Sequence, residues 1–249
     1  GGPPELARVA DALADETGVI ACQRMHATAG QLPTTLSVYE ALLACWRFLL
    51  TGSPPDMDRG CQSASAAADR SPESPTAVAH AAWMQLARYL TDPDPRQRPP
   101  QQALASLERA LSLAPADPWV LLHLAYALWI TRDPLGPAPI CRRIDGRAAS
   151  GSFQGLLGAL LVVSAIDLAR GEALLTEAIR RVPQPLPLFT HALAVSRFRQ
   201  SDLAGMGAAL ATSTARSDPL PIVLRMALAC RGGDIRFAHR LAAAAEDLL

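Results

Sequence analysis

The sequence contains no lysine and no asparagine, so its 23 basic residues are all arginine. Both missing amino acids use A-rich codons, and their absence indicates a GC-rich genome rather than a function. Nor is one sign of charge in excess, since the formal net charge is +0 at pH 7. Nucleic-acid-binding proteins usually carry a basic excess. We therefore expect no direct nucleic-acid binding by this chain.

Paired cysteines and long apolar runs are also missing. The five cysteines stand at positions 22, 45, 61, 141 and 230, an odd number without a CxxC pair. This usage is typical of reduced, mostly buried thiols in a cytoplasmic protein rather than of a disulfide framework. The most apolar stretch, 156–166, is too short to span a bilayer, which takes ~20 residues. No signal peptide is recognisable, so we expect a cytoplasmic protein without a membrane partner.

Sequence motifs for catalysis are absent as well. The chain has no GxSxG nucleophile elbow, no P-loop and no GxGxxG. Its five histidines are scattered, and none is paired with another at metal-ligand spacing. We interpret His80, His123 and His191 as half-buried helix residues. The sequence thus predicts no catalytic residue, no metal site, no cofactor and no enzymatic activity.

One four-point pattern is present and recurs along the chain. It is clearest as small, large, small and proline at Ala103, Leu107, Ala110 and Pro115. Pro183 closes another copy 68 residues later, which is two steps of 34. The other copies of the pattern are Gly60–Ala64–Ala67–Pro72, Pro137–Cys141–Ile144–Ala149, Gly171–Leu175–Ala178–Pro183 and Gly205–Ala209–Thr212–Ser217.

A period of 34 residues predicts a solenoid, in which units bury their apolar faces only by stacking on their neighbours. Small residues let two antiparallel helices approach, a large residue fills the space between them, and the proline ends the second helix. No sustained period-two alternation suggests strands. We expect an all-α fold, an α-solenoid of antiparallel helix pairs. An N-terminal helical segment, 1–33, precedes the repeat domain, 34–249, and 92–100 is an exposed inserted loop. The helices we expect include 4–15, 137–149 and 152–169.

The pattern resembles the second helix of the tetratricopeptide repeat (TPR), and Asp117-Pro118-Trp119 with the residues that follow resembles its first helix. The match to the TPR pattern is specific in 101–132, fair in 56–90 and 171–199, and weak elsewhere. In 137–149 a proline replaces the first small residue. The resemblance implies a TPR-like superhelix with a concave binding face.

A narrower resemblance covers nearly the whole chain. Glu5–Ala14, Gly18–Ala21 and Leu36–Leu43, followed by the repeats, are similar to the C-terminal TPR region of bacterial winged-helix transcriptional regulators and class III adenylate cyclases. In that family the repeats follow a DNA-binding or cyclase domain, neither of which is present here. The resemblance implies a regulatory region, bacterial and cytoplasmic, whose output domain lies elsewhere or is missing.

Carrying over the concave positions of the TPR family gives a candidate groove that is rich in aromatic residues and poor in charge. Three of the four tryptophans fall in it, although aromatic residues make up only 5% of the chain. Exposed apolar patches and their Trp and Tyr residues commonly mark interaction sites. The alternative is that these rings are core, or are covered by the N-terminal helices. The predicted groove residues are Trp83, Leu86, Trp119, Leu122, Tyr126, Trp129, Phe153, Leu156 and Leu160.

Three hypotheses stay open on the sequence. The leading one is a non-catalytic interaction and sensory scaffold that binds a peptide, a partner protein, an apolar effector or its own output domain. The second is the regulatory or dimerising region of a nucleotide cyclase. The third is a structural module that assembles into a homo-oligomer, because the final helix lacks the polar face of a capping repeat.

Overall fold

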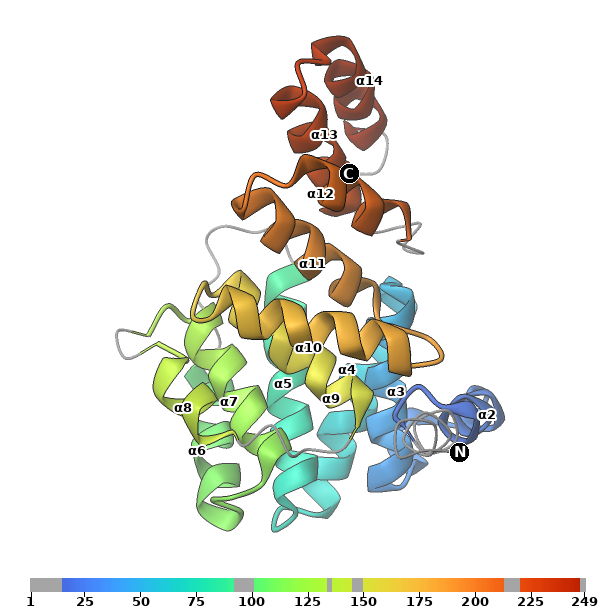
Figure 1. Ribbon diagram of the computed structural model, residues 1–249. Coiled ribbons are helices and arrows are strands. Elements are labelled where there is room, and N and C mark those ends of the chain that lie inside the picture. The colour runs from blue at the N-terminus through green and yellow to red at the C-terminus, as the bar shows by residue number, and fades with distance from the viewer. Residues whose placement is uncertain (1–14, 92–100, 134–135, 145–149, 213–219, 247–249) are drawn as a thin grey trace, which may run out of the picture.

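The computed structural model describes residues 15–91, 101–133, 136–144, 150–212 and 220–246. Within these ranges the chain forms thirteen α-helices and one short 3-10 helix, and no strand (Figure 1). The predicted helix over 4–15, except for its last residue, and the inserted loop 92–100 lie outside the described residues. The all-α prediction is confirmed.

The helices follow one another along the chain. They are α2 (Val19–Thr28), η1 (Pro33–Thr35), α3 (Val38–Thr51), α4 (Pro54–Arg70), α5 (Pro75–Thr91), α6 (Gln101–Leu113), α7 (Pro118–Ile130), α8 (Ala138–Arg143), α9 (Gly151–Val163), α10 (Leu168–Arg181), α11 (Pro187–Arg199), α12 (Leu203–Ala211), α13 (Leu220–Arg231) and α14 (Ile235–Glu246).

Local sequence fixes where several helices begin. Ser37 and Glu40 form a reciprocal capping box at the start of α3. Asp117 accepts hydrogen bonds from Trp119 N and Val120 N, and proline follows it at the first position of α7. These signals place the turns at the ends of the repeat units.

Contacts between helices run along the chain order, as a solenoid requires. From α3 to α14, each helix packs on its neighbour in sequence, except that α8 and α9 make little or no contact with each other. The first helices of the hairpins, α3, α5, α7, α9, α11 and α13, also pack on one another. The array rises from α3 at its broad end to α14 at its narrow end (Figure 1). The TPR-like α-solenoid is therefore the observed fold.

The recurring small and large residues lie where the helices of a hairpin meet. Ala103, Leu107 and Ala110 are fully buried in α6. The closest approach is between α9 and α10, where a Cβ atom added to Gly171 would lie 2.9 Å from the Gly158 carbonyl oxygen and 2.8 Å from Val162 Cγ2. The residues that recur with the 34-residue period thus lie at the contacts between paired helices.

A second 34-residue relation joins successive units. Arg109 Nη2 donates to the Pro72 carbonyl over 2.9 Å, and Arg143 Nη2 donates to the Pro115 carbonyl over 3.0 Å. The two arginines occupy the same position of the repeat, and each carbonyl belongs to the proline that closes the unit before it. Guanidinium donors therefore tie the end of one unit to the second helix of the next.

Two element boundaries differ from the sequence expectation. The predicted helix over 137–149 is the six-residue α8, which ends before Ile144 takes an extended conformation. The predicted helix over 152–169 is broken by a turn after Val163, in which Ala165 has φ of 57°. Neither glycine nor proline marks this turn, whereas Asp167 caps the next helix through Arg170 N.

The core of the described residues is mostly one cluster that extends from α2 to α11, and a smaller cluster joins α11, α12 and α13. Ala21 and Met25 of α2 belong to the main cluster. The division of the chain at residue 33 stays a prediction. None of the described helices combines the length and apolarity that crossing a bilayer would need.

Candidate functional site

The nine predicted groove residues all lie on first helices of hairpins, namely α5, α7 and α9, and they come together in space. Seven of them are buried: Trp83, Leu86, Leu122, Tyr126, Phe153, Leu156 and Leu160. Trp119 and Trp129 are partly buried and pack against the same core. The structure therefore does not present these side chains as an exposed apolar patch, and their role in binding stays a prediction.

Aromatic rings make most of the contacts in this cluster. Trp119 meets Trp46 edge-on at a centroid distance of 5.7 Å and Phe153 at 4.8 Å. Trp83 packs against Tyr126 at 5.1 Å, and the Tyr126 hydroxyl donates to the Leu156 carbonyl over 2.8 Å. Edge-to-face pairs add about 0.5–1.5 kcal/mol each beyond their buried area. The predicted residues thus join α3, α5, α7 and α9.

Two buried histidines from different helices meet at the centre of this cluster. The rings of His80 and His123 lie 4.5 Å apart, and Trp83 stacks on His123 at 5.6 Å. His80 Nδ1 is 2.8 Å from the Thr76 carbonyl, whereas nothing among the described residues hydrogen-bonds to His123 Nδ1. Burial lowers the pKa of His80 to about 4. Burial first, and then the nearby His80, hold the pKa of His123 well below its usual range.

Almost no free space remains between these rings. The void that His80, His123, Trp83, Trp119 and Tyr126 surround measures about 10 Å³. A void of this size is about that of one water molecule. The described residues also contain no group of three or more His, Cys, Asp or Glu that could hold a metal ion. The cluster is consequently an interior contact of the array.

Trp129 lies at the edge of the aromatic cluster. It lines a shallow hollow of about 530 Å³ together with Leu90, Arg132 and Pro137. Leu90 is exposed there. Of the nine predicted residues, Trp129 is the one that borders a hollow with room for a ligand, but this hollow is separate from the other eight side chains.

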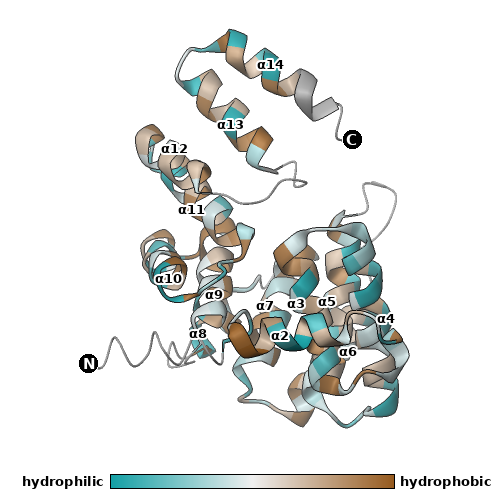
Figure 2. Ribbon diagram, turned by 90° about the vertical axis from the view of Figure 1, so that its right-hand side faces the viewer, coloured by the Kyte–Doolittle hydropathy of each residue, from teal (hydrophilic) through white to brown (hydrophobic). Residues whose placement is uncertain are grey.

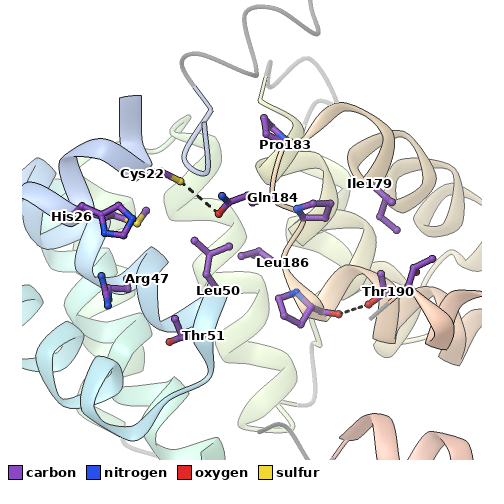
Figure 3. A pocket seen from close by; sticks show the side chains of 14 residues that line it. Cys22, His26, Arg47, Leu50, Thr51, Ile179, Pro183, Gln184, Leu186 and Thr190 are labelled. Atoms are coloured by element: carbon purple, nitrogen blue, oxygen red, sulfur yellow. Dashed lines mark hydrogen bonds between the residues drawn. The ribbon is translucent and has the colours of Figure 1, made fainter. Parts of the chain in front are cut away.

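A larger cavity, of about 620 Å³, lies between segments that are distant in sequence (Figure 3). We call it the α2–α11 cavity. One wall comes from α2 and the end of α3, and the other from α10, the turn after it and the start of α11. Its lining residues are Cys22, Met25, His26, Arg47, Leu50, Thr51, Ile179, Pro183, Gln184, Pro185, Leu186, Pro187, Thr190 and Thr212.

The α2–α11 cavity is lined mainly by apolar side chains, and polar groups such as that of Gln184 also line it. Leu50 of one wall and Leu186 of the other lie near each other (Figure 3). Thr190 Oγ1 donates to the Pro187 carbonyl over 2.9 Å. Drug-sized ligands occupy clefts of roughly 300–1,000 Å³ with this kind of lining. Its volume and chemistry therefore suit a small, largely apolar ligand.

Charge in the α2–α11 cavity is already compensated. Arg47 Nε pairs with Asp56 Oδ1 over 2.8 Å. Burial opposes ionisation of Asp56, but hydrogen bonds from Thr51, Ser53 and Arg47 outweigh it and hold its pKa below the usual range. Burial raises the pKa of the Cys22 thiol, which keeps it protonated at neutral pH. The cavity accordingly offers no activated nucleophile at this cysteine.

All five cysteines are free, as the sequence predicts. Cys45 and Cys141 are buried, Cys22 and Cys61 are partly buried, and Cys230 is exposed. Burial raises the pKa of Cys141 to about 11. Cys45 and Cys141 are therefore packing residues of the core.

Comparisons with known proteins place the fold. No known protein family matches the chain, and no curated protein matches it either. Among solved structures, a monomeric mutant of IFIT1 with Gppp-AAAA matches with a TM-score of 0.62 and 10% sequence identity, over 89% of this chain and 53% of that one. A further variant of that mutant, with m7Gppp-AAAA, gives the same values. This chain spans about half the length of IFIT1. The likeness identifies a TPR-like helical repeat scaffold.

Proposed function

We propose that this protein is a non-catalytic sensory scaffold that binds a small, largely apolar ligand in the α2–α11 cavity. The observation that carries the proposal is the cavity itself, about 620 Å³ in volume and lined by leucine, isoleucine, methionine and proline side chains. Helical repeat scaffolds commonly bind in the concavity that their superhelix creates. A peptide or partner protein is the alternative occupant.

We further propose that the scaffold is the regulatory region of a bacterial transcriptional regulator. The support is the sequence similarity of Glu5–Ala14, Gly18–Ala21 and Leu36–Leu43 to that family. The regulatory region of a nucleotide cyclase and a self-assembling module are the alternatives. The coding sequence that adjoins this chain tests the choice, because a winged-helix domain or a cyclase domain would lie in it.

Direct RNA binding is not part of the proposal, although the IFIT1 structures contain capped tetra-adenylate. Arg47, the arginine that lines the cavity, is paired with Asp56. Phosphate binding depends on cationic side chains that can release counterions, and the charge of the whole chain is balanced. A titration with Gppp-AAAA should therefore show no saturable binding at 150 mM salt.

Binding of the neutral dye N-phenyl-1-naphthylamine tests the cavity. The dye fluoresces in apolar surroundings, and we expect saturable binding to the wild-type protein. Leu50→Arg places a charge on one wall and Ile179→Arg on the other, so each should weaken binding at least tenfold. Burying an unpaired guanidinium beside the dye costs more than the ~1.4 kcal/mol that a tenfold change represents. Fluorescence titration gives the dissociation constants.

Leu113→Arg is the matched control. Leu113 is 44% exposed at the end of α6 and does not line the cavity. The control should bind the dye as the wild type does, and circular dichroism should show the same helix content in all three variants. Unchanged binding in both cavity variants would reject the cavity as the site.

A further inference from the structure

We propose that segment 15–28, which comprises α2 and the residues before it, is a movable wall of the α2–α11 cavity. Ligand binding and docking of this segment would then stabilise each other. The inference rests on the proposed function, because it takes the cavity as the binding site. It adds a regulatory mechanism that the cavity alone does not imply.

Segment 15–28 crosses from the first hairpin to the middle of the array. Helix α2 lies on the outside of the array beside α3, at the edge in Figure 1 and on the side that faces the viewer in Figure 2. Its Asp15 carboxylate is buried at the start of α9, where Ser152 N donates to Oδ2 over 2.9 Å and Ser152 Oγ donates to Oδ1. Thr17 N donates to the same carboxylate over 3.0 Å. A carboxylate at a helix N-terminus is stabilised by these donors and by the helix dipole.

Other contacts hold the segment further along. Cys22 Sγ lies 3.7 Å from Gln184 Oε1 across the cavity (Figure 3). On the other side, Arg24 pairs with Glu40 over 2.7 Å. Arg59 Nη2 donates to the Thr28 carbonyl over 2.6 Å. The Arg24 side chain is 56% exposed, so solvent screens its ion pair and little stabilisation follows from it.

The hydrophobic anchoring of segment 15–28 is correspondingly limited. Ala21 and Met25 are buried, whereas Val19 and Ile20 are 48% and 55% exposed. Gly18, at the start of α2, provides no side-chain cap. Segments with few buried apolar contacts open at a lower free energy than the core of the same protein. The buried Asp15 carboxylate is thus a polar contact that helps to keep this wall in place.

Ligand binding and docking of segment 15–28 are coupled because the segment forms part of the cavity wall. Cys22, Met25 and His26 line it, so a bound ligand touches α2 only while segment 15–28 is docked. A ligand shifts a conformational equilibrium by the difference between its affinities for the two states. This linkage is reciprocal. Release of the segment must weaken ligand binding by the same factor by which ligand binding favours docking of the segment. In the proposed regulator, docking of this segment would report the bound state to a domain attached on its N-terminal side.

The first measurement is hydrogen–deuterium exchange of the full chain. Asp15→Ala removes the acceptor of the Ser152 hydrogen bonds, so segment 15–28 should be mostly undocked and amides in 18–28 should lose most of their protection from exchange, while those of α3 to α7 stay unchanged. Asp167→Ala is the control, because it removes a helix-capping carboxylate of α10 that segment 15–28 does not touch. Exchange in 18–28 should not change in the control. Equal exchange in both variants would overturn the proposal.

The second measurement is dye binding to the same proteins. Asp15→Ala should bind N-phenyl-1-naphthylamine at least fivefold more weakly, since affinity falls in proportion to the docked fraction. Saturating dye should slow exchange of 18–28 in the wild type. Ser152→Ala removes the Ser152 hydroxyl, one of that residue's two donors to the Asp15 carboxylate, and should also speed exchange in 18–28 and weaken dye binding. Agreement between the two variants would show that the effect is not a folding defect peculiar to Asp15→Ala.

The outcomes separate the two proposals. Dye binding that Leu50→Arg and Ile179→Arg leave unchanged rejects the cavity as the binding site, and with it the coupling. Dye binding that these variants abolish, but that Asp15→Ala and Ser152→Ala do not alter, keeps the cavity and rejects the movable wall. Loss of most of the protection in 18–28 with unchanged dye affinity also overturns the coupling, because a mostly undocked wall should weaken binding.

Discussion

Gly171→Val should lower the free energy of unfolding by about 3 kcal/mol, the upper end of the usual cost of overpacking a core. Even one carbon atom at this position would lie 2.9 Å from the Gly158 carbonyl oxygen and 3.2 Å from Leu161 Cβ. A backbone carbonyl cannot rotate away as a side chain can, so α9 and α10 must separate. Urea denaturation followed by far-ultraviolet circular dichroism measures the loss.

Gly207→Val is the matched control for this substitution. Gly207 is also helical, but a Cβ atom there would meet only Leu228 Cδ2, at an ordinary contact distance of 3.5 Å. Glycine is a poor helix former, and valine is slightly better. The free energy of unfolding of the control should change by less than about 0.5 kcal/mol. Similar losses in both variants would show that the α9–α10 contact is not as tight as described.

Acidification from pH 7 to 4.5 should destabilise the protein by about 2–3 kcal/mol through His80 alone. Its pKa is about 4 in the folded protein and near 6.5 in the unfolded chain. Below pH 6.5 the unfolded chain therefore binds a proton that the folded protein excludes, and stability falls as the pH falls. His123, whose pKa is lowered still more by burial, adds to the effect in the same direction. Thermal unfolding across this pH range measures it.

The double variant His80→Phe with His123→Phe isolates this titration. It should flatten the pH dependence between 6.5 and 4.5, whatever its stability at pH 7. The carboxyl groups of Glu40 and Asp56, whose pKa values hydrogen bonds lower, add their own losses chiefly below that range. Leu113→Arg, which keeps both buried histidines and is at an exposed position, should keep the wild-type slope. An unaltered slope in the double variant would assign the effect to other groups.

The fold was predictable because a solenoid is built from contacts that are local in sequence. The spacing from Ala103 to Pro115 specifies one helix and its end, and its recurrence specifies a stack. The exceptions have local causes. Pro137 in place of a small residue precedes the shortened α8, and the turn at Ala165 has no glycine or proline to mark it. The sequence signal for that turn is Asp167, a residue type that commonly caps the start of a helix.

The aromatic cluster shows a different limit of sequence reasoning. The resemblance to TPR proteins predicted that Trp83, Trp119 and Tyr126 lie on one side of the first helices, and the structure brings them together. Periodicity does not tell whether another layer covers that side. Here Trp46 of α3 and Phe153 of α9 close over Trp119, and the rings are core contacts.

The α2–α11 cavity was beyond the reach of the sequence for a geometric reason. Its walls come from Cys22, Leu50 and Leu186, which lie far apart along the chain, and their separation depends on the curvature of the whole array. No repeat period encodes that curvature. The alternating prolines 183, 185 and 187 are the one local signal, since such a run cannot be helical throughout and instead forms a rim.

The bond between Ser152 and Asp15 also bears on the order in which the molecule assembles. It joins residues 137 apart, whereas each hairpin closes over a short turn. Bringing the ends of a flexible loop of that length together costs about 4 kcal/mol of chain entropy. Helix pairs can nucleate and propagate without this closure. Segment 15–28, although synthesised before its partner, therefore reaches its native place only after the array has been built as far as α9, and refolding should record its docking as a late kinetic step.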